Sequence, residues 1–275
     1  MDQTSHAINV LSWASDIHLD HSKQEAYDHF INKIKEQNPS HVLLAGDIAN
    51  ATQVIDRLTS IQSALNTDIY FVLGNHDYYG SSIKAIRDEM ITLVANHTGL
   101  FYLTQINDVI ELNPQSALIG HDGWADAKEG DFQNSTVVLN DYILIDELSN
   151  ISRHALKAKL HALGEAAADK LRPQLQKALS KYKKVIMLTH VPPFVECCLY
   201  QNKPSTSDWS PHFVCRSIGE MITQVMANFP DNELLVLCGH SHHHADYSPS
   251  KNIQVIVSGA EYGSPMPQDR IILDS

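Results

Sequence analysis

The sequence is poor in cysteine and in long apolar runs, and each shortage excludes a class of protein. Only 4 residues are cysteines, and they lack the paired spacing of a disulfide framework or a zinc site, so we expect reduced thiols. The apolar runs are strand-length, far short of the roughly 18 residues that a membrane helix needs. The first residues show no basic stretch followed by an apolar core, which is the pattern of a secretory signal. These absences favour a cytoplasmic protein with no membrane partner.

Positive charge is also scarce. The chain has 20 Lys and Arg against 32 Asp and Glu, a formal net charge of −12. Affinity for nucleic acid comes mainly from Lys and Arg that neutralise phosphates, so this balance argues against an extended nucleic-acid groove. Histidine, by contrast, is abundant, with 16 residues. Because imidazole is the commonest metal ligand and a proton shuttle near neutral pH, this excess directs attention to metal and acid–base chemistry.

The pattern of apolar residues predicts an α/β protein. Over the first hundred residues, short β-rich runs alternate with helical patterns, which is typical of βαβ units and a largely parallel sheet. In this part we expect strands at Ile8–Ala14, His41–Ala45 and Ile69–Leu73, and helices at Ser22–Gln37, Thr52–Leu65 and Ser82–His97. Later strands are expected at Val109–Leu112, Ala117–Ile119, Val185–Leu188, Leu234–Leu237 and Ile253–Val257.

The second half combines helices with two irregular segments. Residues 147–184 read as one or two long helices interrupted near Gly164 and Pro173, and a further helix is expected at Ser217–Phe229. Residues 120–142 and 191–215 lack periodicity, and we expect loops that face a substrate. No linker or repeat is visible, so the prediction is a single domain over residues 1–275.

Polar clusters follow five of the expected strands, at the point where each strand ends. They are Asp16 with His18, Gly46-Asp47, Gly74-Asn75-His76-Asp77, His190, and Gly239-His240-Ser241-His242. Because the carboxyl ends of strands form the ligand crevice in open α/β sheets, these strand ends would bring their side chains to one place.

The chemistry of these side chains indicates metal binding. Apart from the pair His76 and Asp77, the clusters hold two carboxylates, four histidines and one amide. Such a donor set, without thiolate, suits ions such as Mn, Fe, Zn or Co. Seven ligands are too many for one tetrahedral site. They fit two ions about 3.5–4 Å apart with one carboxylate bridging them.

The five clusters resemble, in order, the motif series of the calcineurin-like metallophosphoesterases: D-x-H, G-D-x-x-[DN], G-N-H-[DE], a single H, and G-H-x-H. The resemblance spans residues 16–242 and is closest to bacterial members with an aromatic-bearing loop in mid-chain. It implies a two-sheet β-sandwich flanked by helices (αββα) and two metal ions, Mn, Fe or Zn. It also implies that the first ion is held by Asp16, His18, Asp47 and His242, and the second by Asp47, Asn75, His190 and His240.

The same resemblance implies a reaction. A hydroxide between the two metals would attack a phosphomono- or phosphodiester, with His76 as general acid at the leaving group and Asp77 orienting its ring. Besides its place in the metal site, Asn75 is expected to contact the substrate. His121 and Trp124 in the mid-chain loop are also expected to face this small phosphate ester, whose identity the sequence does not give.

Two alternatives stay open. A protein that keeps the fold but has lost catalysis would act as a binding or scaffold protein, although such relatives are expected to have eroded ligands and none is eroded here. Another dinuclear hydrolase, acting on amide or lactone bonds, would lack the G-N-H-D motif.

For residues that lie close to the motifs but outside them, we expect no part in the chemistry. The loop carboxylates Asp122 and Asp126 are expected to be solvated. His243 and His244 are expected to extend the strand after the last motif, and His212 has no partner that the sequence identifies.

Overall fold

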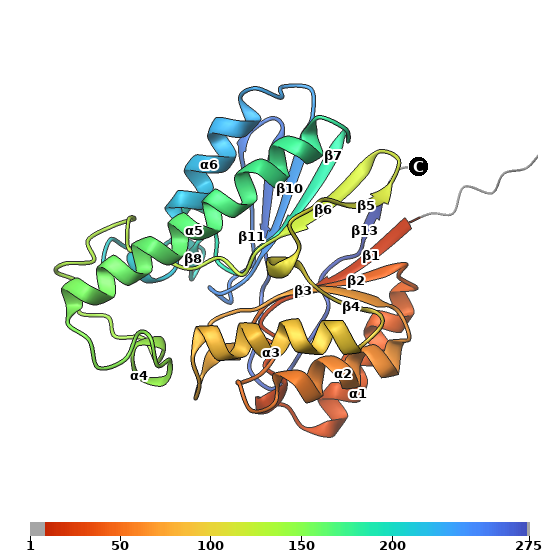
Figure 1. Cartoon of the computed structure of the whole chain (residues 1–275), viewed down its shortest axis with the longest axis horizontal. Helices are drawn as coiled ribbons and strands as arrows, with labels where there is room; N and C mark the ends of the chain where they lie inside the picture. Colours follow the sequence, from red (N-terminus) through yellow and green to blue (C-terminus); the bar gives the residue numbers. More distant parts are fainter. Residues whose placement is uncertain (1–8, 274–275) are drawn as a thin grey trace, which may run out of the picture.

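The computed structural model describes residues 9–273, and in it two β-sheets stack face to face between two layers of helices (Figure 1). The first sheet has the order β13-β1-β2-β3-β4. Its parallel strands are β1 (Asn9–Ala14), β2 (His41–Ala45), β3 (Asp68–Val72) and β4 (Leu100–Tyr102), and the antiparallel edge is β13 (Ile271–Leu273). Three helices cover its outer face: α1 (Gln24–Gln37), α2 (Val54–Leu65) and α3 (Ile83–Asn96).

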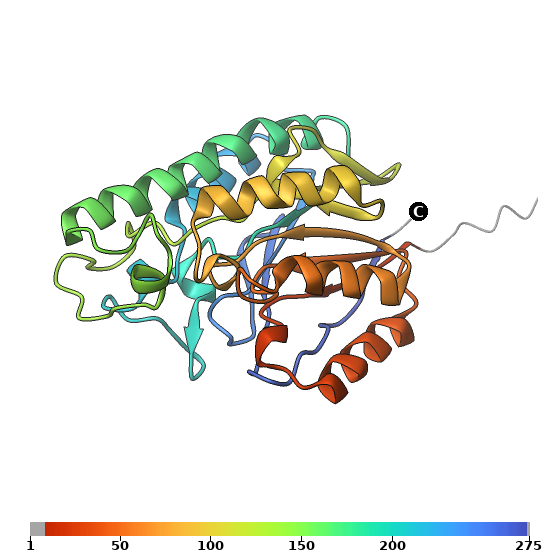
Figure 2. The ribbon, with the colours of Figure 1, turned by 60° about the horizontal axis from the view of Figure 1, so that its bottom comes forward.

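The second sheet has the order β11-β12-β10-β7-β6-β5. Its parallel strands are β12 (Ile253–Val257), β10 (Glu233–Cys238), β7 (Lys184–Leu188) and β6 (Ser116–Gly120), and its antiparallel edges are β11 (Ala245–Ser250) and β5 (Ile110–Asn113). The long helix α5 (Arg153–Leu179) and α6 (Arg216–Met226) cover its outer face. Figure 2 shows α5 and α1 on opposite sides of the stacked sheets.

Residues of the central strands are buried on both faces because a layer of helices covers one face of each sheet and the other sheet covers the second. In β2, Leu43 and Ala45 point toward the second sheet, whereas Val42 and Leu44 pack under the helices of the first. This double burial explains why the central strands read as continuous apolar runs, as expected for parallel strands covered by helices. The predicted fold class is therefore confirmed.

Several elements escaped sequence reasoning because they are short or polar. The edge strands β4, β11 and β13 are of this kind. So are the small helix α4 (Asp141–Leu144) and the hairpin of β8 (Leu199–Tyr200) and β9 (Lys203–Pro204). The expected first residue of the first strand, Ile8, lies outside the described residues.

Two expectations about local structure are wrong. Helix α5 runs without interruption past Gly164 and Pro173. A side chain at Gly164 would collide with Asp126, so this glycine permits close packing of the helix on the mid-chain loop and does not break the helix. His243 and His244 form a turn that precedes β11, and the strand begins only at Ala245.

Asp122 is not solvated; it is a buried junction between the two halves of the molecule. Its carboxylate is almost fully buried and accepts hydrogen bonds from the backbone of Leu73 and from the side chains of Tyr78, Arg87, Tyr102 and Thr104. The Arg87 guanidinium also forms an ion pair with it at 3.0 Å. The backbone carbonyl of Asp122 accepts from the N–H of His190. Asp122 thus fixes the chain just before two of the motifs.

Asp126 is also buried, and its carboxylate accepts a hydrogen bond from the backbone N–H of Ser217 at 2.7 Å.

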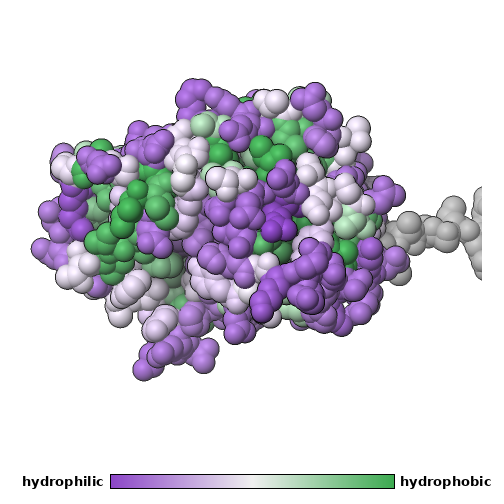
Figure 3. All heavy atoms as spheres, turned by 90° about the horizontal axis from the view of Figure 1, so that it is seen from below, coloured by the Kyte–Doolittle hydropathy of each residue, from purple (hydrophilic) through white to green (hydrophobic). Residues whose placement is uncertain are grey.

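Within residues 9–273, none of the helices combines the length and the apolar character needed to cross a membrane. Seen from below, the surface is a mosaic in which hydrophilic side chains separate smaller apolar patches (Figure 3).

The role of Asp122 gives a stability prediction. Asp122→Asn should lower the free energy of unfolding by about 3 kcal/mol, because it leaves the Arg87 charge partly buried without its carboxylate. Urea unfolding measures this change, with Asp108→Asn as the control, since Asp108 forms an exposed ion pair with Lys177. Equal stability of the two variants would show that the junction does not support the fold.

Candidate metal centre

The chain leaves its strands in strained turns where the motifs begin. Five of the motif residues have a left-handed backbone: Asp16, His18, Asp47, His240 and His242, with φ between 38° and 69°. This conformation costs an L-residue roughly 1–2 kcal/mol. Strained backbone conformations of this kind are frequent at functional sites, and they persist only where contacts with the surrounding structure stabilise them.

The glycines of the motifs are explained by close approach between turns. A side chain at Gly74 would collide with the carboxylate of Asp47, and a side chain at Gly239 would collide with that of Asp16. The turns that carry the ligands can therefore meet only where glycine leaves room.

Four motif residues from three turns form a first cluster. One ligand atom each from Asp16, His18, Asp47 and His242 lies within 4.8 Å of all the others. The Nε2 atoms of His18 and His242 are 3.1 Å apart. Two atoms that bind one ion at about 2.0–2.1 Å lie about 3 Å apart, so these nitrogens have the spacing of two ligands of the same ion. The donor set and its spacing fit a divalent metal.

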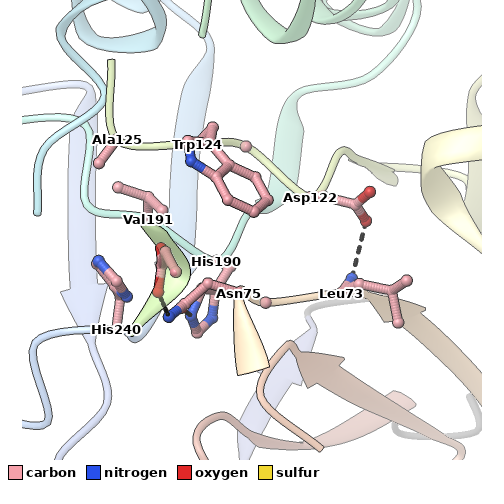
Figure 4. A pocket seen from close by; sticks show the side chains of 11 residues that line it. Leu73, Asn75, Asp122, Trp124, Ala125, His190, Val191 and His240 are labelled. Carbon is pink, nitrogen blue, oxygen red and sulfur yellow. Dashed lines mark hydrogen bonds between the residues drawn. The ribbon is translucent and has the colours of Figure 1, made fainter. Parts of the chain in front are cut away.

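A second group of candidate ligands lies on the other side of Asp47. Nε2 of His190 is 3.4 Å from Asp47 Oδ1 and 3.1 Å from Asn75 Oδ1. The ring of His240 is 5.1 Å from that of His190. Figure 4 shows Asn75, His190 and His240 side by side.

Backbone carbonyls orient the two histidines of the second group. Nδ1 of His190 donates to the carbonyl of Ala45 at 2.8 Å, and Nε2 of His240 donates to that of His212 at 3.1 Å. Neither carbonyl contact uses the other ring nitrogen, and this is the arrangement of metal-binding histidines, in which a carbonyl fixes the ring orientation. His212 is held in turn by Tyr142 and Ser135, partners that the sequence did not reveal.

The electrostatics of the site favour a bound cation. Burial alone would raise the pKa of Asp47, yet the charges on His190 and His76 hold it well below its usual value. Burial likewise acts to raise the pKa of Asp16, but a hydrogen bond with His242 and the charge on His190 lower it. Burial acts to lower the pKa of His190, while Asp47 raises it to about 10. Two ionised carboxylates thus attract positive charge to this point.

Among the described residues, neither lysine nor arginine supplies that charge directly. Within residues 9–273, no lysine or arginine forms a hydrogen bond or ion pair with Asp16, Asp47 or Asp141. Burial lowers the pKa of both His18 and His240 to about 4, so these rings are neutral and can act as ligands.

Asn75 is oriented by residues outside the motifs. Its amide nitrogen donates to Asp141 Oδ1 at 2.8 Å, and the hydroxyl of Tyr79 donates to the same oxygen at 2.7 Å. This arrangement turns the amide oxygen of Asn75 toward His190. Sequence reasoning gave Asp141 no role, because it lies 66 positions from Asn75.

His76 lies at the mouth of the site. Its side chain is 16% exposed, and its Nε2 is 4.0 Å from Asp47 Oδ2. The ring packs on Tyr79 and His18, with centroids 4.3 and 4.5 Å away.

Asp77 is held elsewhere and does not hydrogen-bond to the ring of His76. One carboxylate oxygen accepts from the backbone N–H groups of Ile48 and Ala49, and the other accepts from that of Gly74. These contacts tie the turn after β2 to the turn after β3. Asp77 therefore positions the backbone of the site.

The two mid-chain residues expected to face a substrate are buried. Trp124 packs on Tyr78 and lines a small cavity of about 10 Å³ beside Asn75, His190 and His240 (Figure 4). His121 is buried and accepts a hydrogen bond from the backbone N–H of Gly123. Because both side chains are buried, neither presents a surface that a substrate could contact.

One aromatic residue near the first cluster carries no motif signal. Tyr262 lies in the segment after β12, and its ring centroid is 4.4 Å from that of His18 and 5.0 Å from that of His242. Burial, together with Asp47 and Asp16, raises the pKa of Tyr262, so its hydroxyl is protonated.

Comparison with known proteins agrees with this geometry. The sequence model of the family described as Calcineurin-like phosphoesterase matches residues 13–244. No curated protein matches the chain. Among solved structures, phosphopantetheinyl hydrolase from Mycobacterium tuberculosis is 14% identical, with a TM-score of 0.63 over 95% of this chain and 96% of that one. A dimetal phosphatase from Danio rerio is also 14% identical, with a TM-score of 0.57 over 91% and 87%.

At such low identity these structural neighbours show the fold alone. The match to the family, however, spans all five motifs and the buried Asp and His cluster that they form. The chain therefore belongs to the calcineurin-like phosphoesterase family of metal-dependent phosphoesterases.

Proposed function

We propose that the protein hydrolyses a small phosphate monoester or diester at a centre that holds two metal ions. The position of Asp47 carries this proposal. Its Oδ2 lies 3.7 Å from His18 Nε2 in the first cluster, and its Oδ1 lies 3.4 Å from His190 Nε2 in the second group. A carboxylate with one oxygen toward each set of ligands is suited to bridge two ions.

The ligands divide into two sets that share Asp47. The first ion would be held by Asp16, His18, Asp47 and His242, and the second by Asp47, Asn75, His190 and His240. Two such ions, which we propose to be Mn, Fe or Zn, would activate a water molecule as the nucleophile and neutralise charge on the phosphoryl group. Two divalent ions carry 4 positive charges against 2 negative charges from Asp16 and Asp47, so the first shell is net 4 − 2 = +2. This explains how an acidic chain can bind an anion.

His76 is the residue best placed to protonate the leaving oxygen. It is partly open to solvent, in contrast to the buried His18, and its Nε2 points into the site near Asp47. The ring is held between Tyr79 and His18. A binding protein without catalysis would need neither this open imidazole nor a complete ligand set.

Loss of a metal ligand should abolish the reaction. Asp47→Asn and His240→Ala should each lower the hydrolysis of p-nitrophenyl phosphate and bis-p-nitrophenyl phosphate by more than about 100-fold, because the nucleophile and the charge on the phosphoryl group depend on the ions. Elemental analysis of the same samples should show less bound metal. Full activity in either variant would contradict the proposal.

Replacing the proposed general acid, His76, should slow catalysis without reducing the amount of bound metal. His76→Ala should slow turnover by about 10²–10⁴-fold while the metal content stays that of the wild type. The matched control is His97→Ala, since His97 is an exposed histidine just after α3. A His76→Ala protein that turned over substrate at the control rate would exclude the assigned role.

Loss of the Asp141 carboxylate should weaken the binding of the second metal ion only. Asp141→Ala removes the acceptor that orients Asn75, and we expect about 10–100-fold weaker binding of the second Mn²⁺ in a calorimetric titration, with the first unchanged. Asp146→Ala, at an exposed aspartate in the turn after α4, provides the control. If both binding steps weakened equally, or neither did, Asp141 would have no specific effect on that ion.

A further inference from the structure

The segment after β12 returns across the first ligand cluster and is fixed at both of its ends. At its start, the N–H of Ala260 donates to the carbonyl of His242 at 3.1 Å. At its end, the N–H of Gln268 donates to the carbonyl of Trp13 at 2.8 Å, and the side chain of Gln37 donates to the carbonyl of Gln268. Tyr262 lies between these anchors and is therefore held in place beside the ligands.

The ring of Tyr262 contacts the cluster with part of its surface and leaves the rest open. It is 51% exposed, although its centroid lies 4.4 Å from that of His18 and 6.1 Å from that of His76. The ring of His21 stands edge-on to it at 5.2 Å with an interplanar angle of 78°. The side chain of His21 is 54% exposed. The two rings form an aromatic corner that opens to solvent next to His76.

The hydroxyl of Tyr262 differs from those of six buried or half-buried tyrosines. The hydroxyls of Tyr27, Tyr78, Tyr79, Tyr102, Tyr142 and Tyr182 all have a partner at 2.6–2.8 Å. The contact of Tyr262 is to His76 Nε2 at 3.4 Å, which is long for a hydrogen bond. A tyrosine kept for structure alone would normally bury its ring and pair its hydroxyl. This one leaves both available at the site.

Charge around this corner limits what can bind there. The carboxylates that act on Tyr262 are those of Asp47, Asp16, Asp20 and Asp141. No lysine or arginine within the described part of the chain pairs with Asp16, Asp20 or Asp47. Two divalent ions at the centre would balance these four carboxylates, so the corner offers a charged leaving group no net attraction, whereas an uncharged planar group could stack on the open ring face.

We propose that Tyr262, with His21 beside it, forms a leaving-group subsite that accepts an uncharged aromatic group on the phosphate ester. The proposal rests on the proposed function and adds the class of substrate. The phosphoryl group would lie at the ligand cluster and the aromatic group against the ring of Tyr262, next to the imidazole of His76 that protonates the leaving oxygen.

The test measures binding, so that it does not depend on turnover. Phenylphosphonate and methylphosphonate carry a P–C bond in place of the ester bond, and their affinities for the Mn²⁺-loaded protein are compared by calorimetry. Aromatic contacts of this kind are worth about 0.5–1.5 kcal/mol, so the wild type should prefer phenylphosphonate by about 3- to 10-fold. Tyr262→Ala should bring the ratio to about one and leave the affinity for methylphosphonate within about twofold.

Two further variants complete the design. Tyr262→Phe keeps the ring and should keep the preference for phenylphosphonate. Tyr247→Phe, on β11 and away from the ligands, is the matched control. If Tyr262→Ala kept the preference, there would be no aromatic subsite. If it weakened both phosphonates equally, Tyr262 would support the metal centre and not contact the leaving group, which also overturns the proposal.

The two proposals fail in different ways. If the wild type hydrolysed no ester yet preferred phenylphosphonate, the proposed function would be wrong and the subsite would stand. If it hydrolysed esters but bound both phosphonates equally, the proposed function would stand and the subsite would be wrong.

Discussion

The burial of two ionised carboxylates, Asp16 and Asp47, at the meeting point of the two sheets is the constraint on which the rest of the site depends. Such charges are tolerated in a protein interior only when opposite charge and hydrogen bonds compensate them. Backbone N–H groups of His240 and His76 supply part of this compensation, and the surrounding imidazoles supply more. In the described part of the chain, no lysine or arginine adds to this compensation, so the arrangement favours a divalent cation.

The sandwich holds this arrangement through contacts behind the ligands. Asp77 ties the turns after β2 and β3 together, and Asp122 joins Leu73 and Arg87 to the chain next to His190. Left-handed turns at five ligands and glycines at the points of closest approach would be unfavourable without these ties. The same carboxylate chemistry thus serves two purposes, since buried aspartates with backbone or arginine partners stabilise the fold and those with imidazole partners form the site.

The sequence allowed the central strands and the buried Asp and His cluster to be predicted, because both depend on local patterns. A strand covered on both faces is a continuous apolar run, and the ligands directly follow such runs. The burial of Asp122 was not predictable, since it depends on Arg87 and Tyr102, which come from separate elements. The hydrogen bonds of Asp77 and the position of Tyr262 likewise depend on contacts between distant segments. Gly164 read as a helix break because its close neighbour, Asp126, is remote in sequence.

If these converging side chains hold the metal ions of a phosphoesterase, hydrolysis must depend on bound metal. The most direct test is a titration of the metal-stripped protein with Mn²⁺, in which bound metal and the hydrolysis of p-nitrophenyl phosphate are followed in the same samples. The account predicts no activity without metal and a rise that saturates as the second ion binds. Hydrolysis by the metal-free protein at the full rate, or metal binding that leaves the protein inactive toward every mono- and diester offered, would contradict it.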